Sequence, residues 1–181
     1  MRIKWFSLIR ITGLLLVLFY HFFQTIFPGG FFGVDVFFTF SGFLITSLLL
    51  EEFGKKSQID LLGFFKRRFY RIVPPVVLMV LVTMPFTLLV RQDYVAGIGG
   101  QIAGVLGFMT NFYEMLTGGS YESQFIPHLF VHNWSLAVEV HYYILWGLAV
   151  WFLSKRSKSS SQLRGMVFLL SAGAFIISFF S

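Results

Sequence analysis

The sequence contains no cysteine and has few charged residues. The absence of cysteine excludes disulfides, thiolate metal sites and cysteine nucleophiles. Charged residues make up 12% of the 181 positions, whereas an ordinary soluble domain carries about 25%. What the chain has in abundance is apolar: 56% of its residues are hydrophobic, and the mean hydropathy is +0.77. This composition predicts an all-α, polytopic membrane helical bundle.

Six apolar segments have about the length that a membrane-spanning helix needs, near 20 residues. They are 11–27, 33–50, 73–90, 95–112, 134–153 and 165–180. The first segment lacks a small-residue cleavage site and runs directly into the second, so we interpret it as a retained span rather than a signal peptide.

The basic residues indicate an orientation for these segments. Arg2, Lys4 and Arg10 place the N-terminus in the cytoplasm, and the basic stretches 51–71 and 155–164 belong on the same side. An even number of crossings must therefore separate residue 71 from residue 155. Three apolar segments lie between them, so one of the three does not cross.

The segment 95–112 is the weakest of the three because it contains five glycines and Gln101. Glycine costs about 1 kcal/mol per helical position relative to alanine. We expect a re-entrant or interfacial element here, which leaves about five spans in a multi-pass protein of the cell membrane. The alternative is that 95–112 crosses, which would move Glu139 to the cytoplasmic half of the membrane.

His21 is an ionisable residue within the first apolar segment, and such a residue is by default a functional-site hypothesis. In the expected topology His21 lies roughly 9 Å and Glu139 roughly 8 Å below the outer face. Asp35 begins the second segment at that same face. The three could form one catalytic cluster, in which His21 acts as a general base and a carboxylate orients its ring. The alternatives are a packed histidine for His21 and a helix cap for Asp35.

Arg68 and Arg71 have the i, i+3 spacing that places two side chains on one face of a helix. Two guanidinium groups on one face could clamp phosphate. The alternative is a positive-inside anchor, which a Lys66-Arg67-Arg68 run resembles equally well. For Arg10 the same two interpretations, phosphate binding and a positive-inside anchor, stay open.

The sequence offers no metal site and no nucleic-acid site. His128 and His132 are spaced i, i+4, but no third ligand accompanies them, so we expect no metal. The net charge of +6 arises largely from basic residues beside apolar segments, with no basic and aromatic groove pattern. We therefore expect membrane lipid, and no nucleic acid, as a partner.

Four stretches together resemble the acyltransferase-3 family of integral-membrane O-acyltransferases. They are 9–21, 29–45, 65–74 and 133–139, in the order in which the family carries its motifs. The departures are Ile11-Thr12-Gly13 after the first arginine and Val140-His141 after the motif glutamate, and neither changes a key residue.

The resemblance implies transfer of an acyl group, usually acetyl, from cytoplasmic acetyl-CoA to a sugar hydroxyl of a surface glycan or its lipid-linked precursor. His21 matches the family's catalytic histidine, and Glu139 the acidic residue of the WSLxxE motif. Arg68 and Arg71 match an RxxR pair on the acyl-donor side, and Arg10 the arginine ahead of the histidine. The most similar subtype is the Gram-positive peptidoglycan O-acetyltransferase.

The length of the chain is about half that of a family domain, which the resemblance implies has about ten spans. We expect a fragment, which can be inactive alone, and a C-terminal extracytoplasmic domain beyond this chain. Two rival interpretations stay open. One is half of a proton-coupled transporter or flippase that uses His21, Asp35 and Glu139 as a relay. The other is a structural fragment completed by a second chain.

Overall fold

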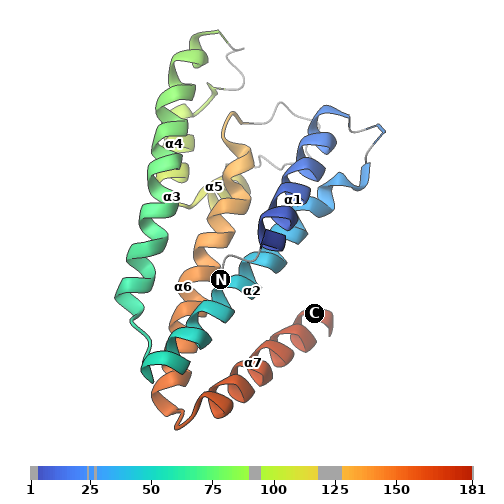
Figure 1. The fold of residues 1–181 in the computed structure, drawn as a ribbon. Helices are drawn as coiled ribbons and strands as arrows, with labels where there is room; N and C mark the ends of the chain where they lie inside the picture. Colours follow the sequence, from blue (N-terminus) through green and yellow to red (C-terminus); the bar gives the residue numbers. More distant parts are fainter. Residues whose placement is uncertain (1–3, 24, 27, 90–94, 118–127, 181) are drawn as a thin grey trace. The chain divides into compact units, whose positions relative to one another are not determined.

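The computed structural model describes residues 4–23, 25–26, 28–89, 95–117 and 128–180 of the chain. Within these ranges the regular structure is helical throughout (Figure 1). The α-helices are α1 (Lys4–Phe22), α2 (Phe32–Lys56), α3 (Leu61–Thr83), α4 (Ile98–Leu106), α5 (Thr110–Thr117), α6 (Trp134–Arg156) and α7 (Ser160–Phe180). Short 3-10 turns are η1 (Pro28–Phe31), η2 (Met84–Leu88) and η4 (Val131–Asn133).

Four of the described helical stretches are long and apolar enough to cross a membrane. They are Phe32–Lys56, Leu61–Leu88, Val131–Arg156 and Ser160–Phe180, and α1 adds the shorter apolar stretch Ile11–Phe22. The prediction of an all-α, multi-pass membrane protein is thus confirmed. The helix expected from 73–90 begins earlier than the apolar segment, at Leu61, and continues through Pro74 and Pro75.

The chain divides into two units. The first contains Met1–Ile59 and Ala149–Ser181, and the second contains Asp60–Leu148.

Glycines bring α1 close to α2 in the first unit. A Cβ on Gly33 would lie 2.7 Å from the Gly13 carbonyl oxygen and 2.8 Å from a Val17 methyl group. A Cβ on Gly30 would lie 2.5 Å from the Leu16 carbonyl oxygen. Such distances exclude any side chain larger than hydrogen unless the backbone moves. The glycine-rich turn after the first apolar segment therefore serves helix packing.

The second unit begins at a capped helix. The Asp60 carboxylate accepts a hydrogen bond of 2.9 Å from the Gly63 backbone N–H, which satisfies one of the open donors at the start of α3. Further along, Val76 and Val80 of α3 pack with Val105 and Phe130 in a buried apolar cluster. This cluster joins α3, α4 and the segment before η4.

The glycine-rich segment 95–112 forms two short helices, α4 and the start of α5, separated by a turn. A nine-residue helix such as α4 is about 14 Å long, which is less than a bilayer core. A Cβ on Gly100 would lie 2.7 Å from the Tyr113 ring, so glycine makes room for α5 against α4. Gly97, the residue just before α4, has a φ of 63°, which favours glycine. The placement of this hairpin at the outer face stays a prediction.

Candidate functional site

Two of the predicted motifs meet around one tyrosine in the second unit. The Tyr143 hydroxyl donates a hydrogen bond to Glu139 Oε1, one turn earlier on α6. The guanidinium carbon of Arg68, on α3, lies 5.6 Å from the Tyr143 ring centroid. The RxxR motif and the WSLxxE motif are 71 residues apart, counted from Arg68 to Glu139 (139 − 68), yet both contribute to one site.

Arg68 is held in this position by one aromatic ring on its own helix, α3, and one on α6. Its guanidinium carbon also lies 5.6 Å from the centroid of Phe64, one turn earlier on α3. Cation–π contacts of this kind contribute about 0.5–2 kcal/mol, with the larger values for desolvated cations. The Arg68 Nε atom is buried and has no hydrogen-bond partner among the described groups. A buried guanidinium donor in this state favours an anionic or oxygen-bearing ligand.

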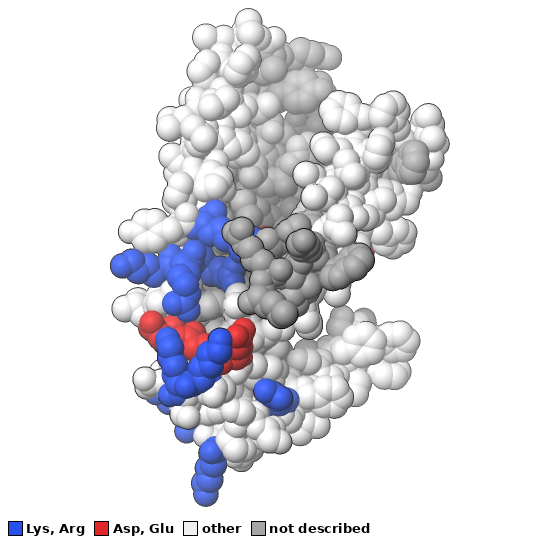
Figure 2. Space-filling view, viewed as in Figure 1, with Lys and Arg blue, Asp and Glu red and all other residues white. Residues whose placement is uncertain are grey.

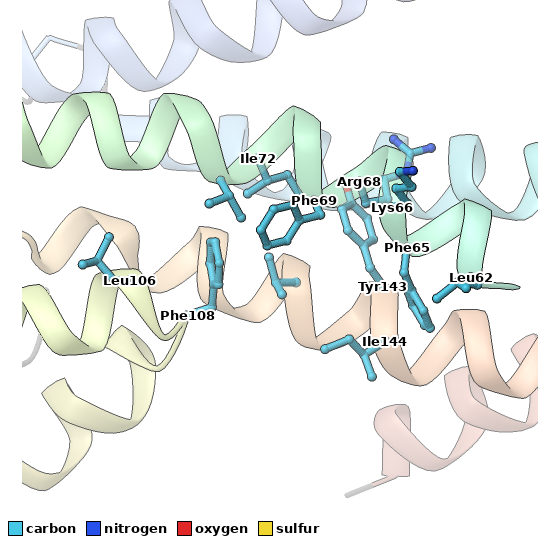
Figure 3. Close-up of a pocket in the computed structure, with 12 residues that line it drawn as sticks. Leu62, Phe65, Lys66, Arg68, Phe69, Ile72, Leu106, Phe108, Tyr143 and Ile144 are labelled. Carbon is cyan, nitrogen blue, oxygen red and sulfur yellow. The ribbon is translucent and has the colours of Figure 1, made fainter.

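A cavity of about 870 Å³ lies beside Arg68 and Tyr143. Lys66 and Arg68 line one side of it, while Leu106 and Phe108 line the other (Figure 3). Nine of its twelve lining residues have hydrocarbon side chains. This volume is within the range of ligand pockets, about 300–1,000 Å³.

Arg71 differs from Arg68 in its surroundings. The Arg71 side chain is exposed, whereas that of Arg68 is partly buried. On the face drawn in Figure 2, Lys and Arg side chains are exposed along with Asp and Glu, and much of the remaining described surface is uncharged. Of the two arginines predicted to clamp phosphate, Arg68 therefore lies within the site and Arg71 lies at the protein surface.

His21 lies at the end of α1 in the first unit. Its Nδ1 atom is 2.8 Å from the Val17 carbonyl oxygen. A carbonyl oxygen can only accept, so Nδ1 carries the proton in this hydrogen bond. In the neutral imidazole Nε2 then carries the lone pair, which is the form that a general base needs.

Asp35 lies in the first turn of α2, where its negative charge is favourable to the helix dipole. Arg10 belongs to α1, but its side chain lies outside the described residues. His21 and Asp35 are in the first unit, while Glu139, Arg68 and Arg71 are in the second. The predicted cluster of His21 with Glu139, and its distance from Arg71, therefore stay predictions.

A second polar group in the same unit was not predicted as a site. His128 Nδ1 donates a hydrogen bond of 2.8 Å to Glu114 Oε2, and the two side chains are 17% and 8% exposed. The Tyr113 ring lies 5.6 Å from the His128 ring. The i, i+4 spacing of His128 and His132 does not indicate this pair, and among the described residues no group of three or more His, Asp or Glu could hold a metal.

The spacing in the sequence indicates the contact between Glu139 and Tyr143. Glu139 and Tyr143 are i, i+4 on one helix, a spacing at which side chains meet. The His128–Glu114 pair had no comparable indication, because 14 residues separate the two and the chain turns between them.

These observations define a multi-pass membrane protein with a cationic and acidic site between its helices. Residues 3–181 match the family model described as an acyltransferase domain, so the chain belongs to the acyltransferase-3 family. No solved structure is significantly similar to it.

Two staphylococcal proteins are similar to most of this chain. O-acetyltransferase OatA of Staphylococcus aureus (strain NCTC 8325 / PS 47) is 33% identical over 174 residues, which cover 95% of this chain and 29% of OatA. Putative O-acetyltransferase SACOL0978 of Staphylococcus aureus (strain COL) is 35% identical over 136 residues, which cover 75% of this chain and 22% of the relative. The chain thus spans less than a third of the length of these two relatives.

Proposed function

We propose that the chain is the N-terminal part of a membrane O-acetyltransferase that uses acetyl-CoA as its donor. The observation that carries this proposal is the meeting of Arg68 and Glu139 around Tyr143. A transporter relay has no need of a partly buried guanidinium donor without a partner, whereas a phosphorylated or thioester donor does.

In the proposed reaction, Arg71 and Arg68 bind the phosphates of acetyl-CoA at the cytoplasmic face, together with Arg10. His21 Nε2 removes the proton of an attacking hydroxyl. The hydroxyl oxygen forms a bond to the thioester carbonyl carbon, and the C–S bond breaks. The thiolate of CoA then accepts the proton from His21. Glu139 or Asp35 stabilises the imidazolium while it carries that proton.

We propose that the acceptor is a hydroxyl of an extracytoplasmic cell-wall glycan, with peptidoglycan preferred. This preference rests on the resemblance to the Gram-positive subtype. It requires the N-terminus to be cytoplasmic and further spans, with an extracytoplasmic domain, to follow this chain. The hydroxyl that attacks first belongs either to the glycan or to an intermediate carrier residue.

The test is a strain that carries His21→Ala in the full-length protein. We expect loss of glycan O-acetyl groups at unchanged membrane levels of the protein. His132→Ala, which removes an exposed imidazole outside the site, is the matched control and should leave acetylation unchanged. Normal acetylation in the His21→Ala strain would rule out the catalytic role.

A second measurement distinguishes the enzyme from a transporter. Purified full-length protein should release CoA from acetyl-CoA when the glycan acceptor is present. A transporter or flippase would release none.

A further inference from the structure

The cavity beside Arg68 has a chemistry that the proposed donor does not explain. Its lining is almost wholly hydrocarbon, with Lys66, Arg68 and the Tyr143 hydroxyl as the polar exceptions. The pantetheine arm of CoA carries two amides, and burial of an amide without a partner costs at least about 1 kcal/mol. The arm would find few hydrogen-bond partners along this lining.

A hydrocarbon chain fits the same lining without this penalty. Apolar surface comes from α3, the end of α4, the turn that follows it and α6, through Phe69, Ile72, Leu106, Phe108 and Ile144 (Figure 3). Burial of a chain against such residues gains about 0.8 kcal/mol per methylene relative to water.

The cavity is open at its apolar rim. Leu62, Phe69, Leu106 and Ile144 line it, and all four are exposed, at 80%, 57%, 47% and 44%. These residues belong to helices of a multi-pass membrane protein. An open apolar rim on such helices admits a chain from the bilayer.

The positive charge at one side of the cavity favours a ligand with an anionic headgroup. Lys66 lines the cavity, and its side chain is exposed, so its ammonium group can meet a headgroup without desolvation. Basic residues at the mouth of a pocket between spanning helices are typical of sites for anionic lipids.

We propose that this cavity binds one anionic phospholipid, with an acyl chain along the apolar lining and the phosphate at Lys66. The occupant is a membrane lipid rather than a reactant, and the proposal does not depend on acetyl transfer. Because Arg68 also lines the cavity, acetyl-CoA is the alternative occupant that the experiment must distinguish from a lipid.

The experiment is native mass spectrometry of delipidated full-length protein, titrated with phosphatidylglycerol or with phosphatidylcholine of the same chains. We expect one tightly bound phosphatidylglycerol. Ile144→Trp fills the cavity and should weaken binding of both lipids at least tenfold. Leu145→Trp is the matched control, because Leu145 is the next residue on α6, is exposed and does not line the cavity.

A second part of the experiment tests the contribution of positive charge by comparing Lys66→Gln with Arg67→Gln. Lys66→Gln should weaken phosphatidylglycerol binding about fivefold and leave phosphatidylcholine unchanged, because one basic residue near a membrane surface contributes a factor of about this size. Arg67 lies outside the cavity lining, so its neutralisation should have little effect.

Three results would overturn the proposal. The first is equal binding by Ile144→Trp and Leu145→Trp, and the second is no preference for phosphatidylglycerol over phosphatidylcholine. The third is one-for-one displacement of the lipid by acetyl-CoA, which would assign the cavity to the acyl donor. A protein that binds lipid in this pattern but releases no CoA would refute the acetyltransferase proposal and leave the lipid site standing.

Discussion

The hydroxyl of Tyr143 donates a hydrogen bond to Glu139, and the ring of the same tyrosine lies against the Arg68 guanidinium. One side chain therefore connects an acidic group on α6 with a basic group on α3. Tyr143 contacts both Glu139 and Arg68. No direct ion pair between these two residues is among the described contacts. Arg68 keeps its buried Nε donor for a ligand.

Tyr143→Phe tests this arrangement directly. The phenyl ring stays against Arg68, but Glu139 loses the donor that orients its carboxylate. A hydrogen bond to a charged group contributes about 1.5–3 kcal/mol. If the lower value is lost from the transition state, kcat/KM for acetyl transfer falls about tenfold.

Tyr142→Phe is the control for this change. Tyr142 is the neighbouring tyrosine and stacks on Trp146, a contact that phenylalanine preserves. Both variants should be measured for CoA release and for thermal unfolding in detergent. A Tyr143→Phe protein with the wild-type rate would show that the hydrogen bond has no part in the reaction.

Gln101 should prove essential to the stability of the second unit. Its side chain is only 1% exposed; it donates to the Ala96 carbonyl at 2.7 Å and accepts from the Phe130 N–H at 3.3 Å. Gln101→Leu leaves the buried Phe130 N–H without this acceptor, at a cost of about 1–3 kcal/mol. The expected result is a clear drop in the melting temperature of the purified protein. Ile102→Leu, which conserves volume at the next position, should change it little.

Gly33→Ala should disturb the packing of α1 on α2. The added methyl group would lie 2.7 Å from a backbone oxygen of Gly13, so one helix must move. Because α1 carries His21, a shift of α1 relative to α2 changes the position of this histidine against α2, and we expect lower stability together with lower acetyl transfer. Gly29→Ala is the matched control, because a Cβ there meets nothing within 4 Å. Equal melting temperatures and equal rates for the two variants would contradict the packing argument.

Local sequence patterns predicted the helices of this protein better than the contacts between them. Apolar segment length predicted the helical class and the approximate position of the long helices. It misplaced the start of α3, because the basic stretch from Lys66 to Arg71 lowers local hydropathy while it still forms helix. The glycines of 95–112 indicated a weak span, and the structure has two short helices there, in which Gly100 accommodates Tyr113.

The candidate site was predictable in its residues but only partly in its contacts. Arg68 and Glu139 could be named from motifs, yet the contact of Arg68 with Tyr143 could not, because no local pattern fixes which face of α3 meets α6. The Glu114–His128 pair is a similar case, since it depends on the fold of the chain between α5 and η4. Bilayer insertion depends on the hydropathy of each segment by itself, so the sequence alone determined that this protein is helical and belongs in a membrane. Which polar groups meet inside it depends on how helices pack, and only the tertiary structure decided that.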